Sequence, residues 1–234
     1  MRHMKTAFTV DHTMNNARLV HLGSLGLELR GKRVLEVGAG LGLLTGLWEE
    51  LDCEIVSTEA RQENIDCNLH YHPWRKPYVF KRDVMQSHSH ADLGMFDIVF
   101  CYGLLYHVPD PAFVIGDLGT ICKELFLVES LVKSADGPPD IGERQEFMCG
   151  INQGLYPMGC TPSRSWYMQE LRCHFPFVYL SRTQPDNGYF PMSWPVPVGY
   201  LARAVFVASR SDLPNLQLSP TLLMEQERYA GQTL

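Results

Sequence analysis

The chain lacks the long apolar runs and paired cysteines that mark membrane and secreted proteins. No apolar stretch in its 234 residues reaches the roughly 18 residues of a membrane-spanning helix, and the basic opening segment 1–5 is not followed by the core of a secretion signal. Seven cysteines occur without a C-x-x-C pair. Four of them, Cys53, Cys67, Cys101 and Cys122, fall in predicted regular elements, which favours reduced thiols. We therefore expect a cytoplasmic protein without membrane attachment.

Positive charge is also scarce. The chain carries 20 Lys and Arg against 26 Asp and Glu, a net charge of −6, and its nearest approach to a basic tract is the segment 30–33. Nucleic-acid binding draws most of its affinity from Lys and Arg against phosphates. The composition therefore argues against RNA or DNA as partner or substrate.

Metal-binding patterns are weak as well. Two histidine pairs, His70-x-His72 and His88-x-His90, fall in predicted loops without further ordered ligands, so we expect surface histidines and no metal site. What is present is a globular composition with 45% hydrophobic and 20% charged residues. Short apolar segments alternate with helical ones along the chain. This alternation predicts an α/β fold with a parallel sheet, in a single domain over residues 1–234.

The most informative segment is 34–42, where a short apolar strand ends in Gly38, Gly40 and Gly42 and a helix follows. Glycine in such a turn accepts positive φ and lets the backbone approach a ligand, while the helix start offers unpaired N–H groups. A dinucleotide site favours G-x-G-x-x-G, and here the third glycine comes too early. Glu36 would repel a pyrophosphate but can accept hydrogen bonds from a cationic amino acid. The segment therefore favours S-adenosylmethionine, which carries no phosphate, over NAD.

Acidic residues close the next two predicted strands, 54–60 and 79–84. Glu59 is placed where a carboxylate can take both ribose hydroxyls, a role that fits NAD as well. Asp83 is placed to accept a hydrogen bond from an adenine amino group, while Val84 presents its backbone. The two strand ends thus predict a nucleoside-binding edge of the sheet.

A fourth strand, 96–103, is followed by L-L-Y-H-V-P-D-P at 104–111. Together with E-x-G-x-G and the two acidic strand ends, this order over residues 30–132 resembles the class I S-adenosylmethionine-dependent methyltransferases. The resemblance implies a Rossmann-like three-layer sandwich whose seven-stranded sheet is mostly parallel with an antiparallel last strand. It implies S-adenosylmethionine as cofactor and S-adenosylhomocysteine as product. The cofactor contacts it implies are Glu36, Gly38, Ala39, Gly40, Glu59, Ala60, Asp83, Val84, Cys101 and Tyr102.

Three residues are candidates for the chemistry. Methyl transfer is an in-line displacement, so the protein must align the acceptor and, for a hydroxyl, supply a base. His107 follows strand four at the edge where ligands bind and titrates near neutral pH; its alternative role is capping or packing. Tyr106 is placed to orient a substrate or to pack. Glu129, near the end of strand five, is placed to hold the acceptor or act as base, or to pair with a basic neighbour.

The remaining segments surround this core. Apolar residues at helical spacing over 14–28 predict a lead helix, within residues 1–30, across the cofactor mouth. Residues 133–164 are too long and too rich in Gly and Pro for a connector, and we expect a substrate-side insertion. The aromatic and proline-rich loop 185–200 walls the acceptor pocket or packs on itself. The pattern also predicts helices over 41–51, 61–70, 111–124, 161–174 and 222–229, and strands over 125–132, 177–182 and 201–209.

The sequence thus indicates an S-adenosylmethionine-dependent methyltransferase that acts on a small molecule through an O-, N- or C-nucleophile. Three alternatives stay open. One is a tRNA-modifying enzyme, because segments 104–107 and 127–132 are most similar to the branch containing tRNA wobble-uridine carboxymethyltransferases and their small-molecule relatives. The others are an NAD-dependent oxidoreductase and a non-catalytic partner subunit that binds the cofactor. These patterns determine neither the acceptor nor the oligomeric state.

Overall fold

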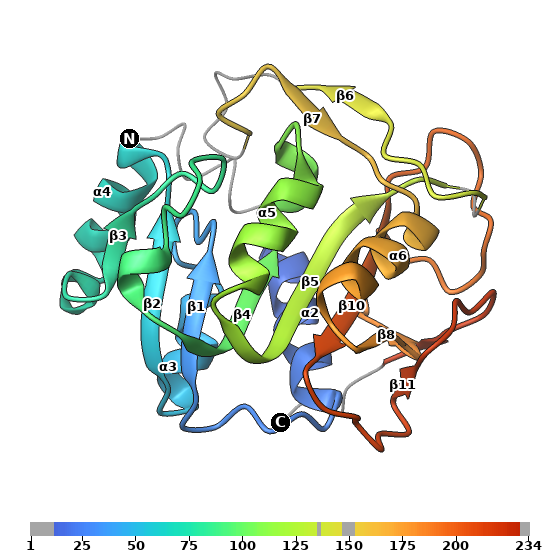
Figure 1. Ribbon diagram of the computed structural model, residues 1–234, viewed down its shortest axis with the longest axis horizontal. Helices are drawn as coiled ribbons and strands as arrows, with labels where there is room; N and C mark the ends of the chain where they lie inside the picture. Colours follow the sequence, from blue (N-terminus) through green and yellow to red (C-terminus); the bar gives the residue numbers. More distant parts are fainter. Residues whose placement is uncertain (1–11, 135–136, 147–152, 230–234) are drawn as a thin grey trace.

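The computed structural model describes residues 12–134, 137–146 and 153–229, so parts of the predicted lead segment and insertion lie outside the described residues. Its centre is an eight-stranded sheet in the order β11-β8-β10-β5-β4-β1-β2-β3 (Figure 1). Strands β1 to β5 pair in parallel, whereas β10 runs antiparallel to β5 and β8. The Rossmann-like fold is confirmed, with one strand more than predicted, because the two-residue β11 joins the edge beside β8. The bounds are β1 Arg33–Val37, β2 Glu54–Glu59, β3 Val79–Lys81, β4 Phe96–Tyr102, β5 Cys122–Val132, β8 Phe177–Ser181, β10 Ala202–Ser209 and β11 Leu218–Ser219.

Helices cover both faces of this sheet (Figure 1). On one face lie α5 (Pro111–Gly119) and α6 (Arg164–His174), and on the other lie α2 (His12–Ser24) and α3 (Thr45–Glu50). The connection from β2 to β3 contains α4 (Gln62–Tyr71). None of the helices in the described ranges combines the length and apolarity needed to cross a membrane. Short 3-10 helices η1 (Pro73–Arg75), η2 (Ala91–Leu93) and η3 (Leu105–His107) lie in the connections.

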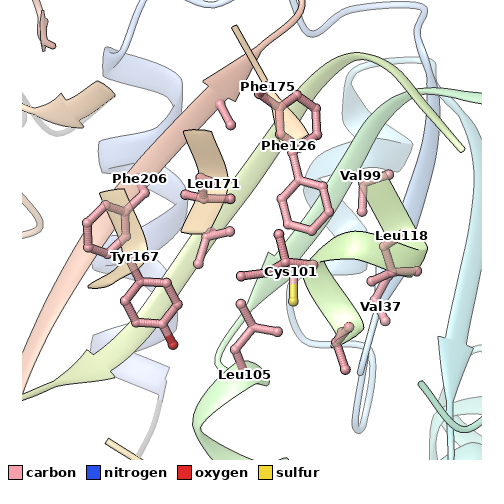
Figure 2. Packing of buried hydrophobic residues seen from close by; sticks show 14 of the residues in the cluster. Val37, Val99, Cys101, Leu105, Leu118, Phe126, Tyr167, Leu171, Phe175 and Phe206 are labelled. Carbon is pink, nitrogen blue, oxygen red and sulfur yellow. The ribbon is translucent and has the colours of Figure 1, made fainter. Parts of the chain in front are cut away.

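The larger core lies between the sheet and helices α5 and α6 (Figure 2). Phe126 of β5 packs on Phe175, with ring centroids 5.6 Å apart, and Tyr167 of α6 packs on Phe206 of β10 at 5.0 Å. Cys101 of β4 is fully buried in this cluster. Every residue of β10 is buried, as expected for a strand covered on both faces.

Several predicted boundaries were wrong, and turns or glycines explain them. The lead helix ends at Ser24 rather than at residue 28, because Gly26 adopts a φ of +64°. The helix after the first strand begins only at Thr45, beyond the glycine turn. The third strand ends at Lys81, and α5 ends at Gly119, which lets β5 begin earlier than predicted.

The predicted helix over 222–229 was also wrong. In that segment β12 (Glu227–Arg228) pairs with β9 (Thr183–Gln184). The buried Gln226 side chain donates to the Ser181 carbonyl at 2.7 Å and accepts from Trp194 Nε1 at 3.1 Å. These bonds hold the tail extended against the sheet, and a helix could not make them.

The insertion contains an antiparallel hairpin of β6 (Glu143–Gln145) and β7 (Met158–Cys160). In Figure 1 the hairpin lies at the top, above α5 and near the carboxyl end of β5. It rests directly on η3, since a Cβ atom built at Gly159 would lie 2.4 Å from the Tyr106 carbonyl oxygen. The hairpin is therefore packed against the strand ends where ligands bind in α/β sheets.

Candidate functional site

The carboxyl ends of the parallel strands border a cavity of about 360 Å³, within the range of small-molecule sites. Its walls come from the loops after β1, β2, β3 and β4, from α2 and η3, and from residues 153–156 before β7. Ten of the thirteen predicted site residues line it: Gly38, Ala39, Gly40, Glu59, Ala60, Asp83, Val84, Tyr102, Tyr106 and His107. Glu36, Cys101 and Glu129 do not line it.

The glycine turn needs its glycines for two reasons. Gly38, Gly40 and Gly42 have φ angles of +71°, +57° and +73°, which side chains rarely adopt. There is also little room for a side chain, because a Cβ atom at Gly38 would lie 3.0 Å from the Leu104 side chain. The Gly38 N–H donates to the Thr58 carbonyl at 2.8 Å. The backbone therefore passes close to the neighbouring strand and presents its edge to the cavity.

The two acidic strand ends both face the cavity. Glu59 accepts hydrogen bonds from the backbone N–H groups of Gly40 and Arg61, each at 2.8 Å, so its carboxylate is fixed in position. Asp83 accepts from the Met85 N–H at 3.0 Å and from the Tyr156 hydroxyl at 2.6 Å. Burial and the bond to Asp83 raise the pKa of Tyr156 to about 12. Tyr156, from the insertion, therefore walls the Asp83 end of the cavity as a neutral donor.

Glu36 lies beneath the glycine turn rather than in the cavity. Its Oε2 accepts from the hydroxyls of Thr45 at 2.6 Å and Ser57 at 2.9 Å, while Oε1 has no hydrogen-bond partner in the described part of the chain. Burial raises the pKa of Glu36 to about 7, although the two hydroxyl bonds oppose the rise. Glu36 therefore supports the turn from below through Oε2, and its contact with the cofactor stays a prediction.

Cys101 and Glu129, the other two predicted site residues that do not line the cavity, are both buried. Cys101 points into the core beside Phe126 (Figure 2), because alternate residues of β4 face opposite sides of the sheet. Glu129 accepts from Arg18 Nη2 at 2.6 Å and from Arg203 Nη1 at 2.8 Å. Burial alone would raise the pKa of Glu129, but the two guanidinium groups lower it. Glu129 thus holds two arginines that themselves line the cavity.

The strand register brings this ion cluster together. Val205 of β10 lies opposite Glu129 of β5, and Arg203 lies opposite Leu131, so Glu129 and Arg203 are diagonal neighbours on one face. Arg18 reaches the same face from α2. Arg203 Nη2 also donates to the Tyr106 hydroxyl at 2.9 Å. Tyr106 is therefore fixed at the cavity wall by a buried arginine.

His107 is the centre of a second polar cluster. Its Nδ1 lies 3.0 Å from Glu146 Oε2, and the same oxygen accepts from the Gly154 N–H at 3.2 Å. Arg144 pairs with the other oxygen of Glu146, and its Nη2 lies 3.4 Å from His107 Nδ1. Burial lowers the pKa of His107, an effect that Glu146 opposes. His107 is thus a neutral imidazole at pH 7, whose Nδ1 faces a buried carboxylate.

Five of these residues were not identified from the sequence. Glu146, Arg144 and Tyr156 lie in the insertion, whose hairpin has no strong strand pattern. Arg203 carried a usable signal, because it is a lone charge in an otherwise apolar strand. Arg18 lies on the buried face of α2, but its charge does not fit an apolar stripe.

The four histidines of the two sequence pairs lie in different surroundings. Across the described ranges, no group of three or more His, Cys, Asp or Glu side chains is arranged to hold a metal ion. His70 lies in α4, as the predicted helix over 61–70 has it, and not in a loop. His90 is buried rather than at the surface, with Nε2 3.2 Å from the Thr58 hydroxyl. Burial lowers the pKa of His90 to about 4, so it is a neutral core residue.

Comparison with known proteins adds a family and a fold. The chain matches the model of the methyltransferase domain family over residues 13–177. It is similar to ubiquinone biosynthesis O-methyltransferases, at 27% identity for Proteus mirabilis (strain HI4320) and 29% for Pectobacterium carotovorum subsp. carotovorum (strain PC1), each over 113 residues. Those alignments cover 48% of this chain and 46% or 47% of the relatives, so the chain spans about half the length of the curated relatives it matches.

Two solved structures that bind S-adenosylmethionine or its product share the fold. The N-terminal domain of EvdMO1 with S-adenosylhomocysteine bound has a TM-score of 0.64 at 19% identity, covering 82% of this chain and 80% of that one. Magnesium protoporphyrin IX methyltransferase from Synechocystis PCC 6803 with bound S-adenosylmethionine has a TM-score of 0.55 at 14% identity, covering 86% and 81%. At these identities the likeness establishes the fold and leaves the substrate open.

Proposed function

Since this chain belongs to the methyltransferase domain family, we propose that it transfers a methyl group from S-adenosylmethionine to a hydroxyl of a small molecule, with His107 as general base. The observation that carries this proposal is the pair of His107 and Glu146 at the cavity wall, with Nδ1 and Oε2 3.0 Å apart. An imidazole that is neutral and backed by a carboxylate is suited to take a proton from a hydroxyl. An acceptor that needs no base would not require this arrangement.

The residues present fit the cofactor. Glu59 would hold the ribose hydroxyls, and Asp83 with the Val84 backbone would meet the adenine, beside the wall that Tyr156 forms. The methionine part would lie along the turn of Gly38, Ala39 and Gly40, beside Ala60 and Tyr102.

Two buried donors suit the methionine carboxylate. Arg18 Nε and the Tyr102 hydroxyl have no hydrogen-bond partner within the described ranges, and both residues line the cavity. Arg18 lies over the turn after β4, since a Cβ at Gly103 would be 3.3 Å from its Nη2. A carboxylate between these donors would satisfy them, because unpaired buried donors are costly.

The proton path uses the chain's own residues. A carboxylate beside Nδ1 favours the tautomer with the proton on Nδ1, which leaves Nε2 of His107 free to accept the acceptor's proton. Glu146 then stabilises the imidazolium that forms. When bound, S-adenosylmethionine supplies the electrophilic methyl group. Tyr106, held by Arg203, packs beside His107 with ring centroids 4.1 Å apart and would align the acceptor.

We further infer that the chain works as one domain in the cytoplasm. A single sheet runs from residue 33 to residue 219 and includes strands from both halves of the chain, which supports one domain. The six cysteines described, Cys53, Cys67, Cys101, Cys122, Cys160 and Cys173, are unpaired thiols, which suits a reducing compartment. Fractionation of the native cells would test the location.

The function is tested with His107→Gln and, as a matched control, His70→Gln on the exposed side of α4. S-adenosylhomocysteine affinity is measured by calorimetry, and methyl transfer to a panel of phenols and catechols is followed by mass spectrometry. Loss of the base is expected to lower kcat by about 10²- to 10⁴-fold while cofactor affinity changes little. Full turnover in His107→Gln would remove His107 as the base.

A further inference from the structure

Positive charge is concentrated at one end of the cavity. Among the described residues, its charged lining consists of five arginines, His107 and the two carboxylates Glu59 and Asp83. Two of the arginines have partners of their own, since Arg61 donates to the Gln153 and Gly154 carbonyls and Arg82 pairs with Asp92. The other three, Arg18, Arg144 and Arg203, lie beside Gly103, His107 and Tyr106, at the end formed by the turn after β4 and by η3.

The charges at this end do not cancel. Glu129 and Glu146 lie behind the arginines, and each has its pKa held below the usual range by its partners, despite burial. His107 is neutral. Three guanidinium groups against two carboxylates leave one positive charge at this end of the cavity. Solvent screening is weak at the buried Arg18 and Arg203 and stronger at Arg144, whose side chain is 29% exposed.

Two of the three arginines lie on the acceptor side. The guanidinium carbons of Arg144 and Arg203 lie 5.2 and 5.0 Å from the centre of the Tyr106 ring, beside the proposed base. Arg144 Nε is buried without a hydrogen-bond partner within the described ranges. Arg18, by contrast, lies over Gly103 at the proposed methionine end. The methionine part of the cofactor carries one ammonium group and one carboxylate, so its binding leaves the single excess positive charge unchanged, and Arg144 Nε remains as a donor for the acceptor.

We propose that the acceptor is a small hydroxy acid, whose carboxylate binds between Arg144 and Arg203 while its hydroxyl faces His107. This inference rests on the proposed function, because it names the acceptor for that site. Arg144 supplies a hydrogen-bond donor, and Arg203 supplies charge. The apolar body would pack on Leu131 and Leu201, which line the same wall. A single excess positive charge matches a carboxylate better than a phosphate ester, which carries nearly two negative charges at pH 7.

The test measures binding and needs no turnover. Benzoate and benzamide, its uncharged analogue of similar shape, are each titrated by ligand-observed NMR into the protein saturated with S-adenosylhomocysteine. The same titrations are repeated in the absence of S-adenosylhomocysteine. Benzoate is expected to bind at least about tenfold more tightly than benzamide when the cofactor product is present, since a hydrogen bond to a charged group is worth that factor. The preference should fall below about threefold in Arg144→Gln and be partly restored in Arg144→Lys. It should persist in Arg30→Gln, which changes an exposed arginine.

Other outcomes would overturn the proposal. Equal affinity for the two probes, or binding of neither, would remove the carboxylate site. Displacement of benzoate by S-adenosylhomocysteine would place the carboxylate in the cofactor's own position. Tighter binding of phenyl phosphate would replace the hydroxy acid by a phosphate ester. The comparison in the wild-type protein stands even if Arg144→Gln does not fold. Failure of S-adenosylhomocysteine to bind would instead refute the proposed function, and its titration reports that separately.

Discussion

Glu146→Gln removes one negative charge from behind His107 and leaves the shape of the side chain almost unchanged. The hydrogen bond lost in the transition state is one between an imidazolium and a buried carboxylate, 3.0 Å long in the resting protein. Such a bond to a charged group is worth about 1.5–3 kcal/mol. At about 1.4 kcal/mol per factor of ten, kcat should fall by about tenfold to 150-fold. Cofactor affinity should not change, because Glu146 does not line the cavity.

The pH profile separates this role from a structural one. Glu146 raises the pKa of His107 against the effect of burial, so its loss should lower that pKa. The rate rises with pH as the base loses its proton, and the rising limb should therefore move to lower pH in Glu146→Gln. The assay is methyl transfer between pH 5 and 9 in comparison with Glu143→Gln, an exposed neighbour on β6. A lower rate with an unmoved limb would refute the positioning of His107 by Glu146.

Three further predictions concern stability, each measured by urea unfolding. Gly42→Ala should cost about 1–3 kcal/mol more than Gly31→Ala, because both have positive φ but only at Gly42 would the new Cβ lie 2.5 Å from Arg75; equal losses would contradict this. Burial lowers the pKa of His21 from 6.5 to about 4. As the pH falls through this range, the unfolded chain binds the proton before the folded one does, so the free energy of unfolding should fall by about 3 kcal/mol between pH 6.5 and 4. His21→Gln should reduce that loss, and an unchanged pH dependence would exclude His21 as its source. Tyr102→Phe should stabilise the fold by about 1 kcal/mol, because it removes a buried hydroxyl without a partner in the described residues, yet weaken S-adenosylhomocysteine binding; destabilisation would indicate that the hydroxyl is paired.

The strands and their ends followed from local patterns. Apolar runs closed by Gly38, Glu59 and Asp83 identify the edge of the sheet, because parallel strands bring their carboxyl ends to one side. Side chains alternate between the two faces of a strand, so a residue at a strand end faces the cavity only if the alternation and the following turn direct it there. Cys101 and Glu36 fail that condition, since the former faces the core beneath α5 and the latter lies under the turn.

The polar clusters behind the site could not be predicted, because they depend on contacts between distant segments. His107 and Glu146 are 39 residues apart, and the hairpin that joins them is only three residues long on each side. The buried face of α2 could not be predicted fully for the same reason. Its buried face includes Arg18 and His21, whose partners Glu129 and Thr183 lie far along the chain. The spacing of apolar residues along a helix predicts which apolar side chains are buried. It gives no information on a polar side chain that is buried because it has a hydrogen-bond or ion-pair partner.

The most direct test of the cofactor assignment is calorimetric titration with S-adenosylmethionine, S-adenosylhomocysteine and NAD. It is repeated on Glu59→Ala and on Glu63→Ala, an exposed neighbour on α4. Both adenosyl compounds should bind, about tenfold or more weakly in Glu59→Ala and equally in Glu63→Ala, because hydrogen bonds from hydroxyls to a carboxylate are lost only in the former. Binding of NAD alone would contradict the cofactor assignment and, with it, the proposed methyl transfer.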